Sequence, residues 1–282
     1  MLTASDALRT GGGGRRPPPS LTHLYHEYVM QRIEAFKNSV SRDELMRLAG
    51  EAKDGLDEPD EGQLVLTELL MGEVVDQLIF KKLKLKTQKR FQQHVLKLRV
   101  AQKEPTHWGL DGVCPVVPLL PRLVPTDRVL VVGPGAETCA CLLAAHEVDV
   151  VFWASDLGVV ERLEQRLTTE SLSARLLAQM VQFGDWLPTF PDPFDLVVVD
   201  LGALAEVDSH TRFDALLALQ SQTNPNGLHV LLPSTALVPE AVFTFYDGWD
   251  RERMPRRRRG PRPAGCILVK PAPPEQRLAA GA

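Results

Sequence analysis

The sequence predicts an α/β fold, a doubly wound and largely parallel sheet preceded by an N-terminal helical region. Between residues 127 and 271, short apolar runs suited to strands alternate with segments of helical periodicity. The run Val197–Val199 has no polar alternation, which is typical of a central strand buried on both faces. Residues 20–104 show helical periodicity alone. Alternating strands and helices imply parallel strands joined by right-handed crossovers.

Composition divides the chain. The first residues, with a glycine run and three consecutive prolines, cannot bury enough apolar surface to offset the entropy of ordering. We therefore expect a disordered tail, then helices, a connector rich in proline, the α/β domain and a loose C-terminal tail, at residues 1–19, 20–104, 105–126, 127–271 and 272–282.

The helical region contains several amphipathic segments. Apolar residues recur at three- and four-residue intervals from Leu21 to Phe36. Ser41 and Glu44 have the spacing of a capping box, which opens a second helix. A long helix is expected from Gln63 to Gln102, either continuous or broken near Lys86-Thr87, and Pro105 ends it.

The α/β domain contains seven segments that we interpret as strands. Helices are expected between them, over 137–146, 158–168 and 212–220. The last two strands are close enough in sequence to pair antiparallel. The expected strands are 128–132, 149–153, 180–183, 194–200, 228–233, 245–253 and 266–270.

A glycine loop follows the first strand. The apolar run 128–132 leads into Gly133-Pro134-Gly135 and then into a predicted helix. Glycine permits a tight turn and a close approach of a ligand to the backbone, at the carboxyl end of the strand. An ordinary strand–helix turn explains the same pattern, so both interpretations stay open.

Acidic residues follow the next strands. Asp156 lies roughly 20 residues after the glycines, where a carboxylate accepts hydrogen bonds from ribose hydroxyls. Its alternative role is a helix N-cap. Asp185 and Trp186 follow the third strand, with an ordinary turn as the alternative. Asp200 ends the buried strand 194–200 and is expected to face the substrate cleft.

In this order and spacing, these segments and the turn Asn224–Gly227 resemble the class I S-adenosylmethionine (SAM) dependent methyltransferases over roughly residues 126–270. The resemblance implies a seven-stranded, methyltransferase-type sheet and SAM as cofactor. It places the methionine part of SAM at the glycine loop, the ribose at the acid after strand two and the adenine at the Gly-Asp acid. The cofactor-binding candidates are Gly133, Gly135, Asp156, Asp185, Trp186 and Asp200.

Two positions depart from the family pattern. Val131 stands where the family often has an acid, and Glu137 stands where it often has a small residue. The Glu137 carboxylate would either crowd the methionine carboxylate or point away from it. A degenerate, non-catalytic methyltransferase fold is therefore an alternative.

Methyl transfer needs little acid–base machinery, so the sequence leaves the acceptor, a small molecule or a nucleic acid, and the catalytic residues unassigned. Asp200, Asp208 and His210 are either substrate-side groups or solvated loop residues. One alternative function is a non-catalytic subunit that binds nucleic acid or a protein complex. Another is an NAD(P)-dependent oxidoreductase, which does not account for Gly184-Asp185 or the final strand pair.

The charges are clustered although the net charge is only −4. Residues 77–103 contain no acid, and a second basic cluster lies near the C-terminus. Both clusters are candidate nucleic-acid contacts, and the helices are candidates for homo-oligomer contacts. The candidate residues are Lys81, Lys82, Lys84, Lys89, Arg90, Arg256, Arg257, Arg258 and Arg259.

The four cysteines, Cys114, Cys139, Cys141 and Cys266, form no C-x2-C pair, and no histidine cluster accompanies them. We interpret them as reduced thiols and expect no metal site. No apolar run reaches the roughly 18–20 residues of a membrane span, and the N-terminus lacks the apolar core of a secretory signal. These observations predict a cytoplasmic protein without a membrane partner.

Overall fold

A computed structural model of the chain describes residues 20–54, 64–172, 175–252 and 265–272. Its contacts divide the chain into two units, which meet between Leu98 and Arg99. We describe each unit by itself. In the part of the chain that the structure describes, no helix is both long and apolar enough to cross a membrane.

The N-terminal unit is helical and has a small core. Its α3 contacts both α1 and α2, and the core consists of Ile33, Leu48, Ile79 and Leu85. The beginning of α4 joins this unit through Phe91, whose ring stacks on Tyr28 at 4.9 Å. The helices are α1 (Leu21–Ser39), α2 (Arg42–Asp54), α3 (Leu64–Lys82) and α4 (Gln88–Gln102).

The helix predicted from Gln63 to Gln102 is broken, so the continuous version of that prediction is wrong. Lys84 adopts the left-handed conformation with φ 49°. The amide of Leu85 donates to the Phe80 carbonyl at 3.2 Å, and that of Lys84 to the Lys81 carbonyl at 3.1 Å. These two bonds are the Schellman pattern that ends a helix. Burial of Leu85 in the small core supplies the reason for the turn.

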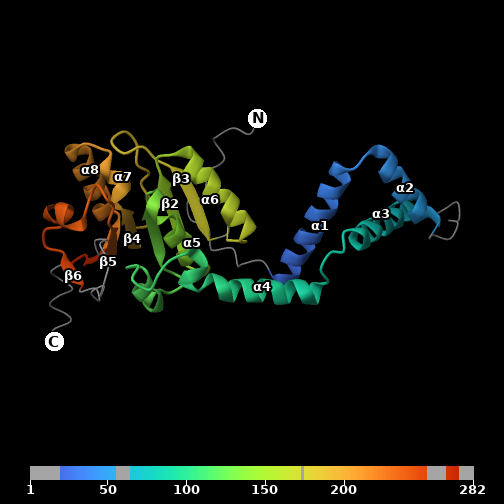
Figure 1. The fold of residues 1–282 in the computed structure, drawn as a ribbon, viewed down its shortest axis with the longest axis horizontal. Coiled ribbons are helices and arrows are strands. Elements are labelled where there is room, and N and C mark those ends of the chain that lie inside the picture. Colours follow the sequence, from blue (N-terminus) through green and yellow to red (C-terminus); the bar gives the residue numbers. More distant parts are fainter. Residues whose placement is uncertain (1–19, 55–63, 173–174, 253–264, 273–282) are drawn as a thin grey trace. The chain divides into compact units, whose positions relative to one another are not determined.

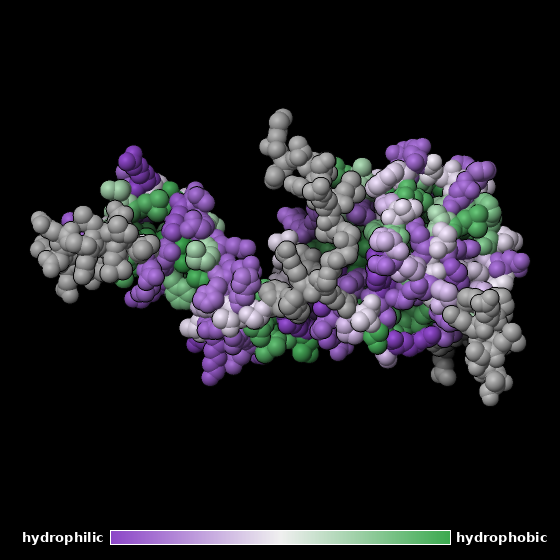
Figure 2. All heavy atoms as spheres, turned by 180° about the vertical axis from the view of Figure 1, so that it is seen from behind, coloured by the Kyte–Doolittle hydropathy of each residue, from purple (hydrophilic) through white to green (hydrophobic). Residues whose placement is uncertain are grey.

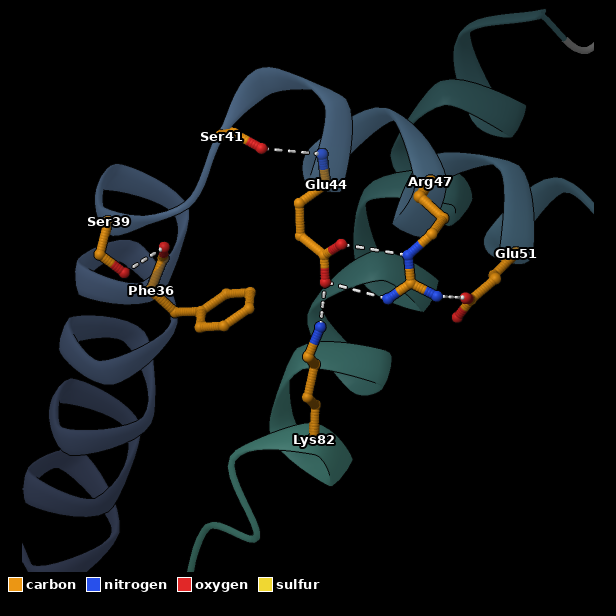
Figure 3. Close-up of polar contacts among 7 residues, drawn as sticks. All are labelled: Phe36, Ser39, Ser41, Glu44, Arg47, Glu51 and Lys82. Carbon is orange, nitrogen blue, oxygen red and sulfur yellow. Dashed lines mark hydrogen bonds and ion pairs between the residues drawn. The ribbon is translucent and has the colours of Figure 1, made fainter.

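A polar cluster joins α2 to α3 (Figure 3). Ser41 caps α2, because its Oγ accepts a hydrogen bond from the Glu44 amide at 3.3 Å. The Glu44 carboxylate accepts from Arg47 on its own helix, with 2.9 Å to Nη2, and from Lys82 at the end of α3. These hydrogen bonds, first from Arg47 and then from Lys82, lower the pKa of Glu44 to about 2. The predicted capping residue Glu44 therefore also joins two helices.

Apolar side chains remain at the surface of the helices. Figure 2 shows hydrophobic residues there, in green, beside hydrophilic ones. Met30 is 50% exposed and Met46 is 64% exposed. The small helical core therefore leaves part of the apolar surface uncovered.

The second unit is built on a seven-stranded sheet with the order β3-β2-β1-β4-β5-β7-β6 (Figure 1). Neighbouring strands from β3 to β5 are parallel, and β7 is antiparallel to both β5 and β6. The strands are β1 (Arg128–Val132), β2 (Asp149–Ala154), β3 (Leu176–Met180), β4 (Phe194–Asp200), β5 (Thr223–Leu232), β6 (Asp250–Glu252) and β7 (Cys266–Val269).

Helices cover both faces of the sheet, as the doubly wound pattern predicts. Val129 and Val131 of β1 belong to one apolar layer, with residues of α5 and α6. Leu130 and Val132 enter the opposite layer, with residues of α7 and α8, because alternate residues of a strand point to opposite faces. The helices are α5 (Glu137–Ala145), α6 (Leu157–Thr169), α7 (Leu201–Ala205) and α8 (Ser209–Ser221).

The positions of two strands differ from the prediction. The third strand occupies 176–180, not 180–183, because its register pairs Leu176 with Val150 and Met180 with Ala154. The strand predicted over 245–253 is reduced to β6, and Pro239–Phe245 forms a 3-10 helix (η4). The antiparallel pairing of the last two strands is confirmed.

Candidate active site

The glycine loop leaves β1 at the point where the strand order reverses. β1 lies between β2 and β4, and the chain proceeds outward in both directions from this centre. The φ of Gly133 is 98°, a left-handed value, and its amide donates to the Trp153 carbonyl at 2.8 Å. Ligands of open α/β sheets bind in the crevice at such a switch point, outside the carboxyl ends of the strands.

Asp200, at the end of β4, is bonded to the glycine loop. Its Oδ2 accepts from the Gly135 amide at 2.8 Å, and its Oδ1 accepts from the Gly202 amide at 2.9 Å. The second bond caps α7. The side chain is 8% exposed. One carboxylate therefore holds both the loop after β1 and the helix after β4.

This packing requires the two glycines. A Cβ on Gly135 would lie 2.6 Å from Oδ2 of Asp200. A Cβ on Gly133 would lie 2.8 Å from the Cβ atoms of both Asp200 and Ala203. The sequence suggested that the glycines make room for a ligand, whereas in this structure Asp200 and α7 occupy the space beside them.

Asp156 ends the chain segment after β2 and caps α6, as one of its predicted alternatives. Its Oδ1 accepts from the Gly158 amide at 2.8 Å. The side chain is exposed. A cap uses one carboxylate oxygen, so this role and a contact to a ribose hydroxyl are compatible.

The Gly184-Asp185 segment forms a tight turn after β3. The amide of Trp186 donates to the Gln182 carbonyl at 2.9 Å, and the φ of Gly184 is 95°. The Asp185 carboxylate accepts from the Gln182 side chain at 2.6 Å. Trp186 is 57% exposed. A Cβ on Gly184 would lie 3.0 Å from Thr211, so the turn lies against the first turn of α8.

Neither a protein-family model nor a curated protein sequence matches the chain. Solved structures match its α/β part. The N-methyltransferase NodS from Bradyrhizobium japonicum is 13% identical, with a TM-score of 0.46 over 55% of this chain and 92% of that one. A TehB-like SAM-dependent methyltransferase from Corynebacterium glutamicum is 14% identical, with a TM-score of 0.46 over 63% and 98% of the two chains. The glycopeptide N-methyltransferase MtfA, solved with S-adenosylhomocysteine, is 13% identical, with a TM-score of 0.46 over 58% and 91%.

The strand order decides the fold class. Five parallel strands are followed by an antiparallel β7 inserted between β5 and β6. The chain has the class I methyltransferase fold. The classic dinucleotide-binding sheet, which has the order 3-2-1-4-5-6, has no such inserted strand.

The two departures from the methyltransferase pattern have structural explanations. Val131 is fully buried in the sheet, between Phe152 of β2 and Val198 of β4. The Glu137 carboxylate pairs with Arg166 of α6 at 3.5 Å, and the guanidinium lies 5.1 Å from the Trp108 ring. Glu137 therefore has a partner on a neighbouring helix.

Asp208 and His210, the remaining substrate-side candidates, belong to the start of α8. Asp208 caps that helix, accepting from the His210 amide at 2.9 Å and the Thr211 amide at 3.1 Å. Hydrogen bonds from Thr211, first of its hydroxyl and then of its amide, lower the pKa of Asp208. The His210 side chain is 85% exposed and pairs with Asp214 at 2.8 Å. Their contacts indicate a helix cap and a surface pair.

A buried polar network in this methyltransferase fold was missed in the sequence. His229 of β5 is fully buried, and both ring nitrogens have partners at 2.8 Å, the Thr223 hydroxyl and the Tyr246 hydroxyl. Burial lowers the pKa of His229 to about 3, with a smaller effect from the charge of Lys270. The ring is therefore neutral at physiological pH. It was read only as part of an apolar strand, and no spacing in the sequence indicates its partners.

Proposed function

We propose that the α/β unit binds SAM at the carboxyl edge of its sheet and transfers the methyl group to a nucleophilic acceptor. One arrangement supports this proposal: the glycine loop, Asp156, the Asp185 turn and Asp200 follow four successive strands, β1 to β4, at the same edge of the sheet. Because the strands are parallel, their carboxyl ends meet there.

The residues at this edge fit the parts of SAM. Asp156 offers an exposed carboxylate to ribose hydroxyls, and Trp186 with Asp185 offers an exposed aromatic face and an acceptor to adenine. Asp200 supplies a negative charge beside the glycine loop. This charge suits the ammonium group of the methionine part. The loop amide of Gly135 already donates to Asp200, so the carboxylate reaches an ammonium group with its remaining lone pairs.

Bound SAM supplies an electrophilic methyl group on a sulfonium. The protein's part is then to align the acceptor and exclude water, which requires no dedicated acid or base. The carboxylate of Asp200 holds the loop and α7 together, so it fixes the wall of the site that faces the acceptor. The acceptor is a small molecule or a nucleic acid.

Calorimetric titration with S-adenosylhomocysteine and SAM tests the proposal. Asp156→Asn keeps an N-cap residue of equal quality but removes the negative charge. We expect micromolar binding by the full chain and a loss of tenfold or more in Asp156→Asn, with an unchanged melting temperature. Asp208→Asn, at the cap of α8, is the matched control and should bind normally. No binding by the unmodified chain at millimolar ligand would refute the proposal.

A non-catalytic role in nucleic-acid binding is the second candidate, and a basic helix surface favours it. A hollow on α4 and the preceding turn is lined by Lys86, Arg90, Gln93, His94 and Lys97. Within the described residues, neither Arg90 nor the nearby Lys81, Lys84 and Lys89 forms an ion pair, whereas Lys82 pairs with Glu44. The arginines 256–259 lie outside the described residues. Cations without acidic neighbours are available to phosphates.

Salt dependence distinguishes this candidate. Binding of a structured RNA or a DNA duplex should weaken linearly in log affinity against log salt. The double variant Arg90→Gln/Lys97→Gln should reduce that slope by about two contacts, whereas Lys82→Gln, at a cation already paired with Glu44, should leave it nearly unchanged. Equal slopes for all three proteins would exclude this surface.

A further inference from the structure

Two thiols from separate segments of the second unit are in contact. Cys114 precedes the 3-10 helix η2 (Val117–Arg122), and Cys139 lies in the first turn of α5, shortly after the glycine loop. Their sulfur atoms are 3.7 Å apart. A disulfide has a sulfur–sulfur distance of about 2.05 Å, so the pair needs an approach of roughly 1.7 Å. Rotation of the two side chains is the natural route.

The two sulfurs have different surroundings. Cys114 is partly exposed, whereas Cys139 is 1% exposed. The hydrogen bond from Cys139, assisted by the backbone amides of Val116 and Val117, lowers the pKa of Cys114 to about 7, against burial and the charge of Asp111. The same hydrogen bond and burial raise the pKa of Cys139. One accessible thiolate thus stands beside one buried, protonated thiol.

We propose that Cys114 is an oxidation site for hydroperoxides and that Cys139 is its resolving partner. The Cys114 thiolate attacks one peroxide oxygen, so that a sulfur–oxygen bond forms, the oxygen–oxygen bond breaks and hydroxide leaves. The Cys139 sulfur, as its proton departs, attacks the sulfenic sulfur. A disulfide forms and the sulfur–oxygen bond breaks, and the proton leaves with the hydroxide as water. Hydrogen peroxide is reduced to two waters, and the two thiols lose two electrons.

The other two cysteines provide internal controls. Cys141 is fully buried, and burial raises its pKa to about 12. Cys266 lies on β7, and burial raises its pKa as well. A thiolate attacks a peroxide and a thiol does not, so neither residue should compete with Cys114.

Disulfide formation would tie the connector to the helix that follows the glycine loop. Closing the chain between residues 114 and 139 restricts the unfolded state. The expected effect is a melting temperature higher by about 5–10 °C in the oxidised protein, reversed by a dithiol reductant.

The test treats the reduced full chain with stoichiometric hydrogen peroxide, followed by alkylation in denaturant. We expect the alkylated thiols to fall from four to two, and a tryptic cross-link between the peptides that contain Cys114 and Cys139. Cys141→Ala should keep the cross-link, because it leaves both partners in place. Cys139→Ala should instead accumulate a sulfenic acid at Cys114, which dimedone traps.

Alkylation rates against pH give a second readout that does not depend on oxidation. In the unmodified chain the midpoint for Cys114 should lie near 7, and in Cys139→Ala it should rise toward the ordinary thiol value of about 8.5. Oxidation of Cys266 before Cys114, a cross-link through Cys141, or four intact thiols after treatment would overturn the proposal. Should Cys139→Ala fail to fold, the peptide map of the unmodified chain still decides.

Discussion

Replacement of Asp200 by alanine perturbs the centre of the proposed site. It removes the acceptor of the Gly135 and Gly202 amides and the N-cap of α7. Loss of an N-cap costs about 1 kcal/mol, and a buried amide without a partner costs about 1–3 kcal/mol. We therefore expect Asp200→Ala to lower the free energy of unfolding by about 2–4 kcal/mol. Asp200→Asn, which retains one acceptor oxygen, should lose about half as much.

Urea denaturation of the full chain and of both variants measures this effect. Titration with S-adenosylhomocysteine in the same samples separates stability from binding. If the charge of Asp200 holds the ammonium group, Asp200→Asn should bind at least tenfold more weakly while remaining folded. Tighter binding by Asp200→Asn would show that the carboxylate blocks the site. A free energy of unfolding within 0.5 kcal/mol of the parent, roughly the effect of a neutral surface change, would refute the packing argument.

Three further predictions concern stability. The pKa of His229 is lowered to about 3 in the folded protein, so the unfolded chain takes up the proton first, and stability should fall by about 1.4 kcal/mol per pH unit from about pH 6.5 to pH 3; denaturation at several pH values should show this slope, and His229→Gln should flatten it. Glu44 has a folded pKa of about 2, below its unfolded value, so its contribution is present above about pH 4.5 and is lost as pH falls toward 2; Glu44→Gln should lower the melting temperature at pH 7 and have less effect at pH 2.5, as followed by circular dichroism. Gly135→Ala places a Cβ 2.6 Å from Asp200 and should destabilise by several kcal/mol, whereas Gly50→Ala, within α2 and with nothing near the added Cβ, should stabilise by about 0.5–1 kcal/mol; equal stabilities in urea would contradict this contrast.

The central strands were predictable because burial and propensity agree there. The first strand was predicted over 128–132 and the fourth over 194–200, and both have these bounds in the structure. The edge strand β3 was misplaced because Leu177 and Met180 are each 53% exposed, so its sequence carries no inward pattern. Its position is set by pairing with β2, a contact that the local sequence does not record.

The candidate site was predictable only as a set of types at strand ends. Asp156 and Asp208 are each followed by a helix, and both cap it. The contact of Cys114 with Cys139 joins segments whose relative position depends on how the connector packs, and no Cys-x-x-Cys spacing announces it. A local motif therefore indicates the element and its end, whereas the partner of each side chain comes from the packing.

The bond between Gly135 and Asp200 shows why a glycine loop alone does not establish a ligand. The two residues are 65 positions apart and meet because β1 and β4 are neighbours in the sheet. Their packing excludes a Cβ at Gly133 and Gly135 whether or not SAM binds. The glycines therefore have a structural reason to be present, and a cofactor would use a loop that this reason already maintains. Binding measured on Asp156→Asn, which leaves the loop intact, separates the two reasons; Asp200→Asn alone does not.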